Sequence, residues 1–267
     1  MSAGTNSILS LRDVSKSFGG LSVISDVSFD VPTGARMALI GPNGAGKTTV
    51  FNLISGFYRP DKGDLLLEGR AIQAIPSRHR IGLGIARSFQ NIRLMPHLSV
   101  VENVMLGQQS RAGGIIDMLK PLSIFGRSDL RQEAEALLDQ MNLDTYPGEV
   151  VATLPYGVRK KIEVVRALAA RPKLLLLDEP AAGLNGAETD NLTEFLKRIS
   201  ATGITLLVVE HDMGLVRQLC DEAVVLNFGR KIYDGPTATV QENPKVLEAY
   251  LGPRHADSVK EGPAHVA

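Results

Sequence analysis

A glycine-rich segment, GPNGAGKTT at 41–49, constrains the fold of this chain more than any other feature. It matches the pattern G-x-x-x-x-G-K-[ST]. It follows a continuous apolar run, MALI at 37–40, which suits a buried strand, and it leads into a helical pattern, TTVFNLISG at 48–56. A strand, a glycine-rich loop and a helix in this order are the context in which the pattern binds phosphate. The alternative, a chance glycine-rich turn, does not explain this placement.

The chemistry of the loop explains its spacing. Gly41, Gly44 and Gly46 let the backbone curl with its N–H groups pointing inward, which makes a cradle for phosphate oxygens at the positive end of the following helix. Lys47 adds a positive charge toward the β- and γ-phosphates, and the Thr48 hydroxyl is placed to ligate magnesium. We therefore expect ATP and Mg²⁺ to bind here. The residues expected at the nucleotide are Gly41, Pro42, Asn43, Gly44, Ala45, Gly46, Lys47, Thr48 and Thr49.

A second candidate site lies in LLLLDEP at 174–180, where an apolar strand ends in two carboxylates. Asp178, at the end of the strand, can hold the magnesium shell, which is the usual partner of a phosphate loop. Glu179 points differently and can take a proton from the attacking water. A strand that ends in an acidic turn is common on its own. The pairing with the phosphate loop makes the functional interpretation the stronger one.

Elsewhere the chain alternates between strand and helix patterns. Strands separated by helices in the last third imply a parallel sheet covered on both faces, so we expect an α/β core. The middle is largely helical, which predicts a helical subdomain at about 90–165. Four apolar residues are expected on one face of the helix after the glycine-rich loop: Val50, Leu53, Ile54 and Phe57. Apolar residues at helical spacing in the middle are interpreted as core: Leu137, Leu138, Met141, Ile162, Val165 and Leu168. The expected strands are 8–14, 23–31, 37–40, 173–177, 204–209 and 223–227, with a turn and another strand at 60–68; the expected helices are 48–56, 131–143, 188–200 and 212–220.

Composition narrows the class of partner. Lys plus Arg total 29 and Asp plus Glu total 29, so the balanced charge gives no electrostatic reason to expect nucleic acid. No signal peptide is visible, and no apolar run approaches the roughly 20 residues of a membrane-spanning helix. If this protein acts at a membrane, we expect it to dock onto a partner that spans the membrane. We expect Cys220 to be a small buried residue, 113–126 to pack on the surface rather than contact a membrane, and 254–267 to form a disordered tail.

Four further motifs occur in a defined order along the chain. Phe18 precedes the loop, Gln90 lies in RSFQNIRL, AGLN at 182–185 follows the carboxylates, and His211 lies in VVEHDM. Together with the two sites above, this order resembles the ATP-binding cassette family over residues 8–252. The resemblance implies a P-loop NTPase fold. It implies one ABC nucleotide-binding domain over 1–253, with an N-terminal antiparallel β subdomain and the inserted helical subdomain.

The resemblance also implies a role for each motif. Phe18 would stack on adenine, His211 would contact the γ-phosphate, and AGLN would face the opposite subunit. Gln90 would contact magnesium and the attacking water, and it would sense the membrane partner. The catalytic residues would then be Glu179, His211 and Gln90, and the metal-binding residues would be Thr48, Gln90 and Asp178.

One motif departs from the family. Its signature loop is usually LSGGQ, and here the matching stretch opens LPYGV, with Leu154, Pro155, Tyr156, Gly157 and Val158. In the family this loop reaches the γ-phosphate held by the other subunit. Pro155 has neither the serine hydroxyl nor a backbone N–H, although Gly157 and the helix N-terminus can still present N–H groups. We therefore expect a weakened contact and two unequal sites.

With its variant signature loop, the chain resembles the ATP-binding subunits of branched-chain amino acid importers. Such an importer has two ATP-binding subunits, and the chain resembles the larger one. The stretches LLLLDEPAAGLN at 174–185 and NPKVLEAYLG at 243–252 agree. This implies a heterodimer with a second homologous ATP-binding subunit, two membrane-spanning permease subunits and, indirectly, a periplasmic solute-binding protein. The chain would lie peripherally on the cytoplasmic face of the inner membrane. Related importers for urea, short amides or aromatic acids carry near-identical motifs.

Two other interpretations are open. A cassette ATPase outside transport, such as a DNA-repair or ribosome-associated clamp, conflicts with the absence of sustained heptads between Thr48 and Leu154 and with the neutral charge. A regulatory subunit that barely hydrolyses ATP would fit Pro155 and Val158. The presence of Glu179 argues against that regulatory role.

Overall fold

The computed structural model describes residues 6–88, 92–109, 124–143 and 145–251. The chain divides into two compact units. Unit 1 comprises Met1–Ile54, Tyr58–Ala74 and Val208–Ala267, and unit 2 comprises Ser55–Phe57 and Ile75–Leu207.

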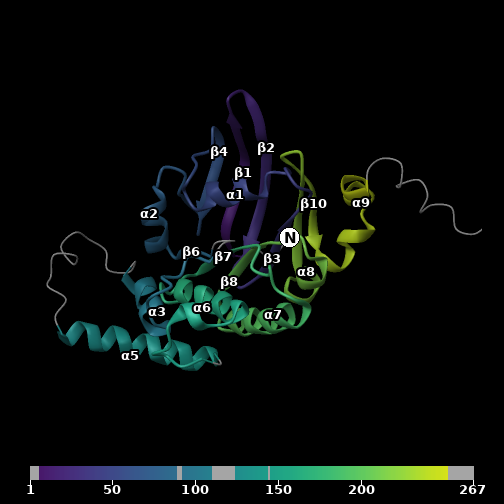
Figure 1. The fold of residues 1–267 in the computed structure, drawn as a ribbon. Helices are drawn as coiled ribbons and strands as arrows, with labels where there is room; N and C mark the ends of the chain where they lie inside the picture. Colours follow the sequence, from purple (N-terminus) through teal and green to yellow (C-terminus); the bar gives the residue numbers. More distant parts are fainter. Residues whose placement is uncertain (1–5, 89–91, 110–123, 144, 252–267) are drawn as a thin grey trace, which may run out of the picture. The chain divides into compact units, whose positions relative to one another are not determined.

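Unit 1 contains a four-stranded antiparallel sheet with the order β2-β1-β4-β5. Its strands are β1 (Ser7–Phe18), β2 (Leu21–Pro32), β4 (Lys62–Leu67) and β5 (Arg70–Ala71) (Figure 1). Leu9 of β1 lies opposite Val31 on one side and Leu67 on the other, and all three are buried. The Gly19–Gly20 turn joins β1 to β2, as the two glycines predict. This sheet matches the expected antiparallel β subdomain.

A second group of strands in unit 1 carries the phosphate loop. β3 (Arg36–Ile40) pairs in parallel with β9 (Glu222–Asn227), and β10 (Arg230–Pro236) pairs with β9 in the antiparallel sense. The apolar run of β3 is fully buried, as a continuous hydrophobic strand predicts. β10 was not expected, because its charged, glycine- and proline-containing sequence reads as a loop; most of it is exposed at a sheet edge.

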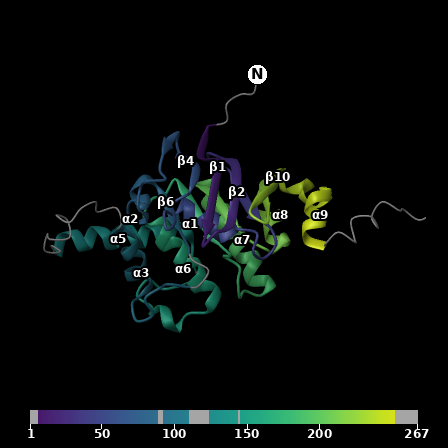
Figure 2. The same ribbon diagram turned by 90° about the horizontal axis from the view of Figure 1, so that it is seen from above.

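Among the described residues, three α-helices complete unit 1: α1 (Lys47–Ile54), α8 (Met213–Leu219) and α9 (Pro244–Leu251). The short 3-10 helix η4 (Thr237–Glu242) leads into α9, which packs beside β10 (Figure 2). Val50, Leu53 and Ile54 of α1 are fully buried. The expectation for Phe57 was wrong: α1 ends at Ile54, so Phe57 lies beyond the helix and is 55% exposed.

The strands of unit 2 are β6 (Ile85–Arg87), β7 (Leu174–Asp178) and the Thr205–Leu207 part of β8 (Thr205–Val209), in the order β8-β7-β6. β6 and β7 are parallel, with Ala86 opposite Leu175. β7 is buried along its whole length, as LLLL predicts. α7 (Gly186–Ala201) follows β7 and begins with a capping box, in which Asn185 and Glu188 satisfy each other's backbone N–H groups.

The helical part of unit 2 contains α2 (Ser77–Arg80), α3 (Val100–Gln108), α5 (Ile124–Met141) and α6 (Tyr156–Leu168), with 3-10 helices η1 (Ile81–Leu83) and η3 (Val151–Thr153). α3 packs against α5 and α6 (Figure 1). The predicted core residues on these helices are buried, except for Leu137, which is partly exposed: Leu138, Met141, Ile162, Val165 and Leu168. The boundaries of the helical subdomain at about 90–165 stay a prediction.

Several predictions fall outside the described residues: Gln90, most of the segment 113–126, and the tail 254–267. Within the described ranges, every helix is too short or too polar to cross a lipid bilayer.

Candidate nucleotide site

The phosphate loop at 41–49 connects β3 to α1, and its shape requires glycine. Gly41, Gly44 and Gly46 all adopt positive φ angles, of 149°, 79° and 104°. A Cβ atom on Gly41 would overlap the carbonyl oxygen of Leu226, and one on Gly46 would press on Ile24. Only glycine combines this backbone conformation with so little space. The turn therefore has the backbone shape that the sequence pattern predicts.

Lys47 closes the loop from within. Its Nζ donates hydrogen bonds to the carbonyl oxygens of Gly41 (2.6 Å) and Pro42 (3.0 Å), and the residue is 8% exposed. The first turn of α1 contains no acidic residue, so the positive end of the helix is not cancelled by a side chain of that turn. Thr48 is exposed at this helix end. The loop thus presents an ammonium group, a helix N-terminus and a hydroxyl, which suits a phosphate chain with its metal ion.

The rear of the loop is held by segments that are far away in the sequence. The Gly229 amide donates to the carbonyl of Ala45 (3.0 Å), and the Ser25 amide donates to the carbonyl of Gly229 (2.9 Å). Gly229 lies in the turn between β9 and β10, next to Phe228, which is 86% exposed. The loop is therefore fixed by β2 and by this turn, and not by its own residues alone.

An aromatic pair lies at the end of β1. The rings of Phe18 and Tyr58 meet edge to face, with centroids 5.0 Å apart, and Lys16 Nζ lies 5.3 Å from the Phe18 centroid. Lys16 also pairs with Asp61 (2.7 Å), and this hydrogen bond lowers the pKa of the Asp61 carboxyl. Phe18 remains 40% exposed, so its ring is available for stacking. Tyr58 was missed at the level of sequence, because its contact with Phe18 spans forty residues.

His211 directly follows Glu210 at the end of β8. Its side chain is 66% exposed, and its Nδ1 lies 3.9 Å from the carboxylate of Glu210, which is almost completely buried. The same carboxylate accepts the backbone N–H of His211 (3.0 Å). Asp212 then caps α8 by accepting the amides of Gly214 and Leu215. The backbone of His211 is thus held on both sides while its imidazole is left accessible.

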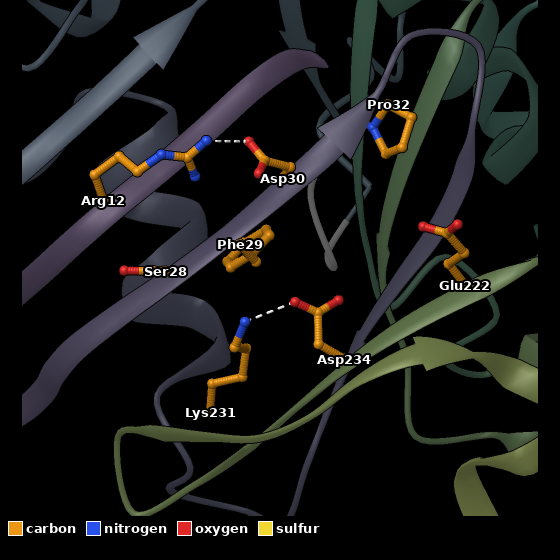
Figure 3. A pocket seen from close by; sticks show the side chains of 8 residues that line it. All are labelled: Arg12, Ser28, Phe29, Asp30, Pro32, Glu222, Lys231 and Asp234. Carbon is orange, nitrogen blue, oxygen red and sulfur yellow. Dashed lines mark hydrogen bonds and ion pairs between the residues drawn. The ribbon is translucent and has the colours of Figure 1, made fainter. Parts of the chain in front are cut away.

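Two cavities lie elsewhere in unit 1. A polar hollow of about 410 Å³ lies between β2 and β10, and it contains the ion pairs Arg12–Asp30 (2.6 Å) and Lys231–Asp234 (2.6 Å) (Figure 3). These charges neutralise each other locally. An apolar cavity of about 300 Å³ lies against Ile40 and Tyr250.

Two buried groups of unit 1 have raised pKa values. Burial raises the pKa of the Tyr250 phenol, and a hydrogen bond from the backbone of Gly41 partly opposes this. Burial also raises the pKa of Cys220 to about 12. Cys220 is 3% exposed, so it is the small buried residue that was expected.

In unit 2, Asp178 ends β7 in a buried ion pair. Its Oδ2 accepts a hydrogen bond from Arg87 Nη2 (2.5 Å), and Arg87 Nη1 also donates to the Ser55 hydroxyl (3.2 Å). The side chains of Arg87 and Asp178 are only 9% and 10% exposed. Arg87 was missed by sequence reasoning, since the motif that contains it drew attention only to Gln90. Arg87 is the last residue of β6, which pairs in parallel with β7, and this pairing places Arg87 beside Asp178.

Glu179 is the second residue of the carboxylate turn, which we define as residues 178–185. Its φ is 46°, in the left-handed region that non-glycine residues rarely adopt. The Ala182 amide donates to the Glu179 carbonyl (3.1 Å), and the Leu184 amide donates to the Ala181 carbonyl (3.0 Å). The side chain is partly exposed, unlike that of Asp178. Adjacent carboxylates therefore have different environments, which suits different roles.

The signature loop, residues 154–158, opens α6. Pro155 occupies the N-cap position without a side-chain hydrogen bond, as its chemistry predicts. Leu154 is buried, Tyr156 is 36% exposed, and Gly157 and Val158 are partly exposed. The Tyr156 hydroxyl donates to the carbonyl of Ala182 (3.3 Å) in the carboxylate turn. Sequence reasoning gave no sign of this contact.

The fold and these sites define a class. A parallel strand, a glycine-rich loop and a helix in this order are characteristic of P-loop nucleotide-binding proteins. A nucleotide-free ATP-binding cassette from an ABC transporter superimposes with a TM-score of 0.82 at 28% identity, covering 92% of this chain and 100% of that one. A cassette in its ADP conformation gives 0.82 at 29% identity, covering 92% and 99%. The fold is that of an ATP-binding cassette of the P-loop NTPase class.

Sequence comparisons give the family. The family described as ABC transporter matches residues 24–182. The branched-chain amino acid transport ATP-binding protein BraF of Pseudomonas aeruginosa is 38% identical over 249 residues, which is 92% of this chain and 98% of BraF. LivG of Escherichia coli K12, of the same description, is 35% identical over 249 residues, with the same coverage. The chain therefore belongs to the ABC transporter family, as an ATP-hydrolysing cassette.

Proposed function

We propose that this chain is the ATP-hydrolysing subunit of an importer for branched-chain amino acids, and the larger of two such subunits. The observation that carries the proposal is the similarity to BraF and LivG along nearly the whole length of all three chains. The variant signature loop at 154–158 is part of that matched length. An importer of related solutes, such as urea, short amides or aromatic acids, would use the same ATPase chemistry.

The proposed assembly contains two cassettes. A phosphate loop needs a signature loop from a different chain, so a second, homologous ATP-binding subunit would face this one as a heterodimer. Two permease subunits would span the membrane, and a periplasmic solute-binding protein would deliver the solute. This chain would then lie on the cytoplasmic face of the inner membrane as a peripheral subunit.

The residues fit a nucleotide with its metal ion. The Lys47 ammonium and the inward-facing curl of the phosphate loop suit the β- and γ-phosphates, and Phe18 offers a partly exposed ring for adenine. Thr48 and Asp178, with Gln90, are the proposed metal-binding residues. When bound, Mg²⁺ would neutralise phosphate charge as it develops during phosphoryl transfer.

Each side chain then has a defined task. Lys47 exchanges its bonds to the Gly41 and Pro42 carbonyls for bonds to phosphate oxygens. Glu179 accepts the proton of the attacking water at its carboxylate, for which its partly exposed position is suitable. His211 contacts the γ-phosphate through its accessible imidazole. The signature loop is presented to the nucleotide of the partner cassette.

The substitution Glu179→Gln tests the catalytic assignment. It keeps the shape of the side chain and removes the base, so steady-state ATP hydrolysis by the assembled transporter should fall about 100-fold or more, while ATP binding is retained. Glu135→Gln is the matched control, because Glu135 lies in a surface pair with Arg131 on α5. ATPase activity near wild type for the Glu179 variant would remove it as the general base.

Transport itself tests the substrate. Proteoliposomes that contain the complete importer and its binding protein should accumulate labelled leucine when ATP is enclosed. Accumulation of urea, a short amide or an aromatic acid in place of leucine would overturn the substrate assignment and leave the ATPase assignment intact.

A further inference from the structure

The signature loop and the carboxylate turn touch each other within unit 2. The Tyr156 Oη–H donates to the carbonyl oxygen of Ala182 (3.3 Å). On the same residue, the Ala182 amide donates to the carbonyl oxygen of Glu179 (3.1 Å). Two successive hydrogen bonds therefore connect the side chain of Tyr156 to the backbone of Glu179.

Packing strengthens this connection. Gly183 has a φ of 82°, and a Cβ atom placed on it would lie 3.2 Å from Cε1 of Tyr156, so the ring lies directly against the turn. A Cβ atom on Gly157 would lie 3.2 Å from Oε1 of Glu188. Glu188 in turn accepts the Asn185 amide at the start of α7 (3.0 Å). The first two residues of α6 thus lie against the middle of the carboxylate turn and against Glu188, which belongs to the capping box of α7.

The Tyr156 ring is also held by its own helix. The Arg159 guanidinium carbon lies 5.6 Å from the ring centroid, and Lys160 Nζ lies 5.7 Å from it. Cations at this range are attracted to the face of an aromatic ring. Lys160 is only 4% exposed, so its position is defined by packing. The ring is therefore fixed to α6 on one side and to the carboxylate turn on the other.

Glu179 is sensitive to such a contact because of its backbone. A non-glycine residue at a φ of 46° keeps this conformation only when its surroundings enforce it. The turn that follows Glu179 supplies that restraint, and Tyr156 is hydrogen-bonded to the middle of the turn. The usual family loop, LSGGQ, has glycine at the position of Tyr156 and so has no side chain to make this contact.

We propose that Tyr156 is a positioning residue that couples the signature loop to the proposed general base, Glu179. The inference rests on the proposed function in assigning those two roles. A shift of the signature loop, as it meets the nucleotide of the partner cassette, moves the Tyr156 ring and with it the carboxylate turn. The chain's own base is thereby adjusted to the occupancy of the other site.

Amide hydrogen exchange on the full-length chain tests the contact without any need for activity. Tyr156→Phe removes one hydroxyl and keeps the ring. We expect exchange of the Ala182 and Leu184 amides to accelerate roughly threefold or more, because the turn loses a hydrogen bond. Tyr146→Phe is the matched control, since Tyr146 lies in the same unit and is 74% exposed. Unchanged exchange in the turn for Tyr156→Phe would overturn the proposal.

Kinetics on the assembled transporter test the coupling. When the general base of the partner cassette is replaced by Gln, the remaining hydrolysis depends on Glu179. In that background we expect Tyr156→Phe to lower kcat about threefold and Tyr156→Ala about tenfold, with the KM for ATP unchanged. The KM is expected to hold because no atom of Tyr156 belongs to this chain's own phosphate loop.

A second background distinguishes this coupling from a role of Tyr156 at the partner's nucleotide alone. In this reverse background, Glu179→Gln removes this chain's general base, and the general base of the partner cassette is intact. If Tyr156 serves the partner's nucleotide alone, its variants would slow hydrolysis only in this reverse background, and that result would overturn the coupling. If no preparation hydrolyses ATP, the proposed function fails, while the exchange experiment still decides the contact.

Discussion

Two charged side chains, one in each unit, are held in opposite ways. In unit 1, Lys47 donates to two neutral carbonyl oxygens of its own loop. In unit 2, Asp178 pairs with a full opposite charge, the Arg87 guanidinium, in a nearly buried environment. The first arrangement is short-range, within seven residues, whereas the second joins residues ninety-one positions apart.

This difference in partners indicates how each side chain is prepared for a ligand. Carbonyl oxygens hold an ammonium group only moderately, so phosphate oxygens, which carry charge, replace them readily. Removing the cation from a buried carboxylate costs more free energy than removing carbonyl partners from an ammonium group, because the carboxylate is left desolvated and uncompensated. Lys47 is therefore prepared to exchange its partners for phosphate oxygens, while Asp178 is fixed by Arg87 before any metal ion arrives.

The largest expected effect concerns Arg87. Arg87→Met removes the cation and leaves Asp178 buried, so the free energy of unfolding should fall by about 3 kcal/mol. Chemical denaturation measures this, with Arg131→Met as the control, since the surface pair of Arg131 with Glu135 is worth about 0.5 kcal/mol or less. Adding Asp178→Asn to Arg87→Met should recover part of the loss. A loss equal to that of the control would break the comparison.

Lys47→Met should show the converse pattern. Loss of its hydrogen bonds to the two neutral carbonyl oxygens predicts a change of about 1 kcal/mol in the free energy of unfolding, whereas the affinity for ATP should fall about 100-fold, because a charge-assisted contact to phosphate is lost. Titration with a fluorescent ATP analogue measures the affinity, and Lys62→Met on the exposed start of β4 is the control. A large loss of stability with unchanged affinity would mean that Lys47 is structural, like Arg87.

The smallest effect separates two glycines of the phosphate loop. Gly46→Ala combines a φ of 104° with a Cβ pressed against Ile24, whereas Gly44→Ala has a φ of 79° and open space. Both variants carry the backbone strain of a positive φ, about 1 kcal/mol each. Only Gly46→Ala adds the overlap with Ile24, so we expect it to lower the free energy of unfolding by about 1 kcal/mol more than Gly44→Ala does. Thermal or chemical unfolding of the two variants measures the difference. Equal losses would show that the loop can move away from β2.

The same contrast explains what the sequence could predict. The phosphate loop, β7 and the two carboxylates are runs of adjacent residues, so local pattern alone locates them. Arg87, Tyr58 and the contact of Tyr156 with Ala182 depend on which segments the fold brings together, and no local pattern encodes that. The N-terminal strands and the buried β7 were anticipated because alternation and continuous apolar runs report directly on burial, whereas the antiparallel pairing was expected only from the family resemblance.

Errors in the expected elements have physical reasons too. Phe57 fits the apolar period of α1, yet the helix ends before the left-handed Gly56, so periodicity overran the true end. β10 was missed because an exposed edge strand needs no hydrophobic pattern. Gln90, in contrast, stays a prediction from its motif alone.

The hydrogen bonds behind the phosphate loop have a consequence for synthesis. Ala45 is bonded to Gly229, and Gly229 to Ser25, so the loop is completed by a residue that the ribosome adds almost two hundred positions later. A nascent chain that stops short of the β9–β10 turn has every residue of the glycine-rich motif, and it lacks the support behind it. Contacts between such distant positions form late and slowly. The capacity to hold nucleotide should therefore arise only after most of the polypeptide has left the exit tunnel.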